Sequence, residues 1–241
     1  MKIQSTANVK NHKVKLLDTG PSGAGKTTSI GTLKAAGFRP IVYGLEAGLL
    51  PLSRVPGGID FIDGSKDENG KPLPRELRSG GLRKFFAFLQ TEECRNKYDT
   101  VVLDSLTEIS QCLFDELKAK YPDRKDSLVL YGELGQYTRS LIKNFRDLDY
   151  HVVITCLTKV EKDEATGKRY VAFDLIGSIS EKVAQLFDIV LYLRVTPEGG
   201  REFVCCQTES IGAKDRSGRL DPIEKPDLGE IFKKVLSDGK E

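Results

Sequence analysis

Residues 20–27 read Gly-Pro-Ser-Gly-Ala-Gly-Lys-Thr and satisfy the spacing G-x-x-x-x-G-K-[ST] in full. Glycines let the backbone curl so that successive N–H groups point inward at phosphate oxygens, and the following helix presents its positive end. We expect Lys26 to reach the β- and γ-phosphates of ATP and the Thr27 hydroxyl to hold Mg²⁺. The predicted nucleotide-binding residues of this loop are Gly20, Pro21, Ser22, Gly23, Ala24, Gly25, Lys26, Thr27 and Thr28.

A carboxylate for the metal side of such a site follows a second apolar run. Residues 100–104 (Thr-Val-Val-Leu-Asp) are β-branched and apolar up to Asp104, which is typical of a buried parallel strand. A strand of this kind delivers its last side chain beside the phosphates, where a carboxylate can orient a water bound to Mg²⁺. We therefore predict Asp104 as a metal-side and catalytic residue, with Ser105 next to it.

Hydrolysis also needs a group that positions the attacking water. Glu46 comes directly after the apolar run 40–45, so we expect it at the carboxyl edge of the sheet, where ligands bind. Glu108, four residues beyond Asp104, is the competing candidate for the same role. Glu46, Lys26 and Asp104 are the predicted catalytic residues.

The elements that must position these residues alternate along the chain. Predicted strands cover 13–18, 40–45, 59–62, 100–104, 151–155 and 189–195, and 202–207 returns as a hairpin partner. Predicted helices cover 26–36, 76–96, 107–121, 128–148, 178–187 and about 228–237. This order predicts an α/β fold with a mostly parallel sheet flanked by helices and an antiparallel C-terminal hairpin.

Length and composition fit one globular domain. The 241 residues, 39% hydrophobic and 30% charged, predict a single domain over 1–241 with its core at about 13–220. The net charge of +2 neither requires nor excludes nucleic acid. We expect a cytoplasmic protein that makes no membrane contact, because no apolar run has the length of a signal peptide core or a membrane span. Its five cysteines are expected to be reduced.

The combination of the loop GPSGAGKTT, Glu46 after the second strand and Asp104 at the end of a central strand resembles the RecA-like P-loop ATPases. The short single-domain form resembles the phage-encoded members associated with single-strand DNA annealing. The resemblance covers about residues 13–220. It implies Mg²⁺-dependent ATP hydrolysis in DNA recombination and annealing. It further implies single-stranded DNA as partner, a single-strand-binding protein beside it, assembly into a homo-oligomer, and a place in the bacterial host cytoplasm.

The same resemblance implies roles for later residues. A polar sensor at the end of the strand after the metal-side strand matches Thr155 or Thr158, where recombinases of the family commonly carry glutamine. Residues 213–216 (Ala-Lys-Asp-Arg) resemble a basic element that reaches the γ-phosphate of a neighbouring subunit. Lys214 and Arg216 are therefore predicted to contact nucleotide in trans, as an arginine finger does.

Two polar segments are candidates for the DNA contact. Residues 118–131 and 159–173 both mix cations with tyrosine, which suits binding of single strands without sequence preference. In the first segment the candidates are Lys118, Lys120, Tyr121, Arg124 and Lys125; in the second they are Lys159, Lys168, Arg169 and Tyr170. Both segments also contain acids, so solvated loops are an equal alternative.

Two other functions share the phosphate loop. A small-molecule or nucleotide kinase needs an arginine-bearing lid over its acceptor, which Arg75, Arg78 and Arg83 could supply. A nucleotide-dependent switch needs only a loop that ATP binding orders.

Overall fold

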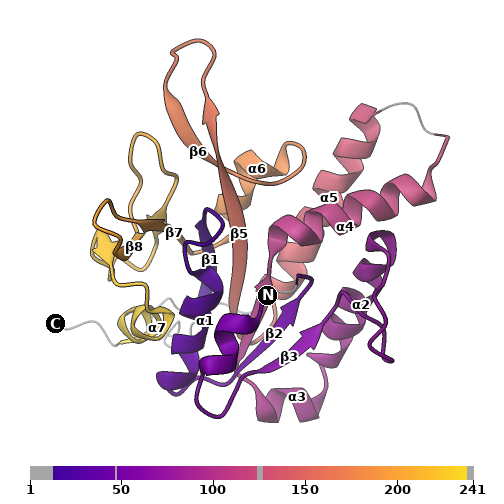
Figure 1. Ribbon diagram of the computed structural model, residues 1–241, viewed down its shortest axis with the longest axis horizontal. Helices are drawn as coiled ribbons and strands as arrows, with labels where there is room; N and C mark the ends of the chain where they lie inside the picture. Colours follow the sequence, from indigo (N-terminus) through magenta and orange to yellow (C-terminus); the bar gives the residue numbers. More distant parts are fainter. Residues whose placement is uncertain (1–12, 47, 124–126, 238–241) are drawn as a thin grey trace, which may run out of the picture.

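The computed structural model describes residues 13–46, 48–123 and 127–237. Its centre is one twisted sheet (Figure 1). The strand order is β10-β8-β7-β1-β5-β4-β2-β3, with β6 paired to β5 and β9 paired to β7. The strands are β1 (Lys15–Gly20), β2 (Pro40–Gly44), β3 (Asp60–Asp63), β4 (Thr100–Asp104), β5 (His151–Lys162), β6 (Arg169–Phe173), β7 (Ile189–Val195), β8 (Arg201–Val204), β9 (Lys214–Asp215) and β10 (Ile223–Glu224).

The sheet is parallel from β3 to β7 and antiparallel beyond it. Strands β3, β2, β4, β5, β1 and β7 run in one direction, whereas β8 and β9 run against β7, and β10 runs against β8. The predicted α/β fold with a mostly parallel sheet and an antiparallel C-terminal hairpin is confirmed. The loops after β1, β2 and β4 leave the sheet at the same edge, where β5 passes between them and continues outward.

Helices cover both faces of the sheet. One face carries α1 (Lys26–Ala35), the short helix η2 (Leu50–Arg54) and α7 (Leu228–Leu236). The other carries α2 (Arg75–Phe88), α3 (Glu92–Lys97), α4 (Leu106–Lys120), α5 (Ser127–Arg146), α6 (Ile179–Lys182) and η3 (Val183–Leu186). Leu16 belongs to the first core and Leu17 to the second, because side chains alternate along a strand.

Two predicted helices are each interrupted. The helix expected at 76–96 is two helices, α2 and α3, separated at Leu89–Thr91. Thr91 causes the break, because its side chain accepts a hydrogen bond from the backbone N–H of Cys94 and so caps a new helix. The helix expected at 178–187 is the single turn α6 followed by the 3-10 helix η3.

The candidate DNA-contact segment 159–173 is a β-hairpin rather than a loop. β5 continues from the core to Lys162 and pairs antiparallel with β6, so the hairpin projects beyond the rest of the sheet (Figure 1). Asp163 closes the turn by accepting hydrogen bonds from the N–H groups of Ala165 and Thr166. Gly167 takes the positive φ of 72° that the turn requires.

The two long helices α4 and α5 agree with the prediction. α4 ends at Lys120 and α5 begins at Ser127, each within one residue of the predicted bounds 121 and 128, so the candidate DNA-contact segment 118–131 begins and ends in helix. Two of its predicted contact residues, Arg124 and Lys125, lie outside the described residues. The hairpin partner expected at 202–207 is β8, which ends at Val204. Within the described part of the chain, no helix combines the length and apolarity needed to cross a membrane.

The crossing of α1 and α7 depends on Gly229. Its N–H donates to the Thr32 hydroxyl at 3.1 Å, and a Cβ there would lie 2.7 Å from the Thr32 carbonyl oxygen. We predict that Gly229→Ala lowers the free energy of unfolding by about 1–2 kcal/mol, because overpacking outweighs the gain in helix propensity. Urea denaturation measures the change. Gly135→Ala in α5, where a Cβ meets nothing within 4 Å, is the control and should be neutral or stabilising; equal destabilisation of both variants contradicts the prediction.

Candidate nucleotide-binding site

The phosphate loop joins β1 to α1 and packs against β7. At Gly20 a Cβ would collide with the carbonyl oxygen of Leu193, so only glycine allows the loop to leave the sheet this close to β7. Gly25, with a φ of 113°, is the N-cap of α1. The loop therefore curls tightly and ends on a helix N-terminus, which is a geometry that binds phosphate.

Lys26 occupies the interior of the loop. Its side-chain nitrogen donates to the carbonyl oxygens of Gly20 at 2.8 Å and Pro21 at 2.9 Å. Burial lowers the pKa of this ammonium group, and the nearby Asp18 and Asp104 carboxyls act in the opposite direction. The contacts fix a cation within the curl of the loop, where it can neutralise bound phosphate.

Asp104 joins the metal side of the site to β5. One carboxylate oxygen accepts from the Thr27 hydroxyl at 3.0 Å, and the other accepts from the Thr155 hydroxyl at 2.5 Å. β5 lies between β1 and β4, which brings Thr155 level with Asp18 on one side and next to the end of β4 on the other. Thr158, the other sensor candidate, instead pairs with Phe173 in the β5–β6 hairpin.

The oxygen atoms around Thr27 fit a magnesium ion. A threonine hydroxyl and a single carboxylate are hard ligands of the kind that Mg²⁺ prefers when substrate phosphates and water complete its shell. The described residues contain no group of three or more His, Cys, Asp or Glu side chains that could hold a metal alone. A cation at this site would therefore depend on the nucleotide for part of its coordination.

Glu46 is exposed at the carboxyl edge of the sheet, as expected, and is held by Ser105. The Ser105 hydroxyl donates to a Glu46 carboxylate oxygen at 3.0 Å and accepts from the backbone N–H of Glu108 at 3.3 Å, as the N-cap of α4. The N–H of Leu45 donates to the Asp104 carbonyl at 3.2 Å. These two contacts bring Glu46 beside the end of β4.

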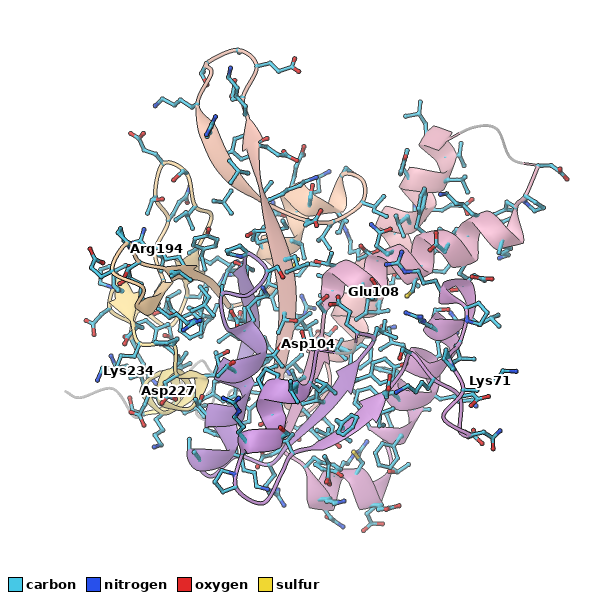
Figure 2. The ribbon with its side chains drawn as sticks, viewed as in Figure 1. Lys71, Asp104, Glu108, Arg194, Asp227 and Lys234 are labelled. Carbon is cyan, nitrogen blue, oxygen red and sulfur yellow. The ribbon has the colours of Figure 1, made fainter. Side chains whose placement is uncertain are left out.

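Glu108 has a different surrounding. It lies on α4, whereas Asp104 ends β4 (Figure 2), and its carboxylate accepts from Arg75 at 2.9 and 2.5 Å and from Arg78 at 3.4 Å. Arg83 pairs with Glu116, also on α4, at 2.7 Å. The three arginines considered for a kinase lid therefore tie α2 to α4, and Glu108 serves as the acceptor of that contact.

Asp18 is a functional candidate that sequence reasoning missed. It lies on β1, has no exposed surface and accepts from the Ser29 hydroxyl at 3.0 Å. Its other oxygen has no hydrogen-bond partner among the described residues. Burial raises the pKa of Asp18 to about 7, although Ser29 and Lys26 act to lower it. The signal available in the sequence was a carboxylate that directly follows Leu16 and Leu17, two residues before the phosphate loop.

The predicted cations Lys214 and Arg216 lie away from this loop. In the antiparallel pairing of β9 with β7, Lys214 lies opposite Val190. Val190 in turn lies opposite Leu17, which is three residues before the end of β1. Arg216 forms an ion pair with Asp188 at 3.3 Å, just before β7 begins. Both cations therefore sit toward the amino ends of the strands, whereas the phosphate loop leaves the carboxyl ends.

Solved structures with a related arrangement of elements include the RadB recombinase, with a TM-score of 0.42 and 17% identity over 79% of both chains. An ATPase of the type III secretion system of pathogenic bacteria gives a TM-score of 0.49 and 17% identity over 81% of this chain and 56% of that one. These scores are too low to carry a functional argument, so the fold assignment rests on the strand order and the phosphate loop described above.

A curated relative and a family model extend the comparison. A protein of Geotalea daltonii described as a nucleotide-binding protein is 25% identical over 190 residues, which are 78% of this chain. The matched region covers 56% of that relative, so the chain spans little more than half of its length. The family model described as AAA domain (AAA_24) matches residues 12–217. With its phosphate loop, its parallel sheet and this match over most of its length, the chain belongs to the AAA_24 family of P-loop ATPases.

Proposed function

We propose that this protein hydrolyses ATP in a Mg²⁺-dependent reaction and uses the reaction to act on single-stranded DNA in recombination and strand annealing. The observation that carries the ATPase part is the Asp104 carboxylate, which contacts Thr27 at 3.0 Å and Thr155 at 2.5 Å. This one group connects the phosphate loop to the strand that leads away from the site.

Each residue has a definite task in this proposal. The loop N–H groups and Lys26 bind the phosphates, and Thr27 with Asp104 would hold Mg²⁺, which supplies charge neutralisation at the phosphates when it is bound. Glu46, oriented by Ser105, accepts a proton from the attacking water. Thr155 holds the second oxygen of Asp104 and so fixes the direction of the carboxylate.

β5 offers a direct connection between this site and a DNA contact. The strand carries Thr155 beside Asp104 and continues without interruption to Lys162 at the tip of the hairpin. If nucleotide binding moves the Asp104 carboxylate, its hydrogen bond to Thr155 would transmit the movement to β5, the strand that continues into the hairpin. This continuity supports nucleotide-dependent DNA binding.

The hairpin has the chemistry of a single-strand contact. Lys162 and Arg169 face each other across its two strands, are exposed, and have no ion pair among the described residues. Val160, 68% exposed, lies on the same face of the hairpin as these two cations. Tyr170, 39% exposed, lies on the other face, where its hydroxyl donates to Glu161 at 2.9 Å. Cations for phosphates next to exposed apolar surface suit a strand bound without sequence preference.

The tip of α4 and α5 offers a second contact surface. Tyr131 stacks on Phe114 with ring centroids 5.4 Å apart, and the Lys118 nitrogen lies 4.2 Å from the Phe114 centroid. Tyr137 is 49% exposed on the same helix as Tyr131. Exposed rings beside cations can stack bases and neutralise the backbone together.

We also propose that the active form is a homo-oligomer, in which Lys214 and Arg216 serve the nucleotide of a neighbouring subunit. Their position away from the subunit's own loop supports action in trans. A single-strand-binding protein is the expected protein partner on DNA. Light scattering with ATP and single-stranded DNA tests the assembly; a particle of one subunit under all conditions contradicts it.

The DNA contact is tested with the double variant Lys162→Ala/Arg169→Ala. We expect weaker binding of a fluorescein-labelled oligo(dT) and a salt-dependence slope smaller by roughly 1.4, because each lost phosphate contact removes about 0.7. Fluorescence anisotropy over a series of salt concentrations, with and without a slowly hydrolysed ATP analogue, measures both quantities.

The control removes the same number of charges elsewhere. Lys71→Ala/Lys225→Ala alters two exposed lysines that have no ion pair among the described residues, and Lys71 lies far from the hairpin (Figure 2). Its binding should equal that of the wild type. If the two double variants lose the same affinity, or if the wild type binds no oligonucleotide at low salt with any nucleotide, the DNA proposal is wrong.

A further inference from the structure

The outer side of the phosphate loop rests on the β7–β8 hairpin. β7 continues past the end of β1, and Arg201 at the start of β8 faces Val195 at the end of β7. The Arg201 Nε donates to the carbonyl oxygen of Ala24 at 2.9 Å. An arginine distant in sequence thus holds the loop of its own subunit.

The Arg201 side chain also packs closely against Gly25. A Cβ on Gly25 would lie 3.3 Å from the Arg201 Cδ and 3.4 Å from its Nε, so the guanidinium covers the residue that caps α1. The same Cβ would lie 3.8 Å from the Leu193 Cδ2. Together the two side chains form a support beneath Ala24 and Gly25, at the point where the loop turns into the helix.

The N–H groups on the two terminal nitrogens of Arg201 have no acceptor among the described residues. They form no ion pair with any described residue either, and the side chain is exposed. A guanidinium presents five N–H donors in a planar fork that suits phosphate oxygens. Arg201 therefore combines a fixed Nε with free donors beside a loop built to bind anions.

We propose that Arg201 is a nucleotide-binding residue that acts within its own subunit: it holds Ala24 and Gly25 in the phosphate-binding conformation and offers its terminal N–H groups to the nucleotide. The role presupposes that the loop binds ATP, as proposed above. It differs from that of Lys214 and Arg216, which lie toward the other ends of the strands.

The test compares Arg201→Met with Arg201→Lys. We expect the methionine variant to bind labelled ADP about tenfold more weakly, because it loses a charge-assisted hydrogen bond. Its KM for ATP should rise by a similar factor, while kcat at saturating ATP stays within about twofold. The lysine variant, which retains a charge and a donor, should recover part of the affinity.

Arg194→Ala is the matched control. Arg194 lies on the same hairpin but pairs with Glu202 on its other face, at 2.7 Å, and is labelled in Figure 2. This variant should bind ADP as the wild type does. The inference is overturned if Arg201→Met binds ADP within twofold of the wild type, or if it loses thermal stability without a split between KM and kcat. Failure of the proposed ATP site is distinguishable, because the wild type would then bind no ADP and Lys26→Ala would change nothing.

Discussion

Replacing Glu46 by glutamine should lower ATP turnover by roughly 10²–10⁴-fold and leave ATP binding almost unchanged. The amide keeps the size of the side chain and can still accept the Ser105 hydrogen bond, but it cannot take a proton from water. Phosphate release under saturating ATP measures turnover, and a labelled ATP analogue measures binding. A loss confined to kcat identifies a group that acts in the transition state.

Glu108→Gln is the control for this result, because Glu108 is the other carboxylate near the end of β4. Its ion pairs with Arg75 and Arg78 predict a loss of stability, since the arginines would lose a charged acceptor. Turnover of the folded variant should fall by less than about tenfold. The assignment is reversed if Glu108→Gln loses turnover and Glu46→Gln retains it.

The comparison of the two glutamates illustrates what the sequence could predict. The phosphate loop is contiguous, so its eight residues specify both their spacing and their chemistry. Glu46 and Asp104 each follow an apolar strand, and parallel strands end at one edge, so their meeting could be expected. Glu108 could be set aside as the base only once α2 placed Arg75 and Arg78 against it.

Two contacts of the site depend on the order of the strands. Arg201, which the sequence did not indicate, reaches Ala24 because β7 lies beside β1, and nothing near residue 201 in the sequence points to that neighbour. Thr155, one of the two predicted sensor candidates, meets Asp104 because β5 is placed between β1 and β4. The β5–β6 hairpin was missed for a different reason, since its exposed strands lack the apolar pattern that identifies a core strand.

Asp18→Asn should stabilise the nucleotide-free protein at pH 8 by up to about 4 kcal/mol. Burial raises the pKa of this carboxyl from 3.8 to about 7. Between these values the unfolded chain ionises Asp18 while the folded protein keeps it protonated, so the free energy of unfolding falls as pH rises from about 4 to 7. Above pH 7 Asp18 is ionised in both states, so the free-energy cost of its buried charge no longer changes with pH. Asparagine carries no charge, so the substitution removes this cost.

Urea denaturation at several pH values between 4.5 and 8.5 tests this sign, because the advantage of Asp18→Asn should grow with pH and level off above 7. Asp99→Asn supplies the opposite case. Burial opposes ionisation of Asp99, but hydrogen bonds from Arg39 and Thr100 outweigh it and lower its pKa. The stability that Asp99 contributes is present above its ordinary pKa of 3.8 and is lost only as pH falls below that value. Asp99→Asn should therefore lose about the same stability at pH 4.5 as at pH 8, in contrast to the growing gain of Asp18→Asn. Parallel pH profiles for Asp18→Asn and the wild type would mean that Asp18 ionises as freely in the folded protein as in the unfolded chain. The carboxylate behind Lys26 would then carry its charge at every pH at which the loop binds phosphate.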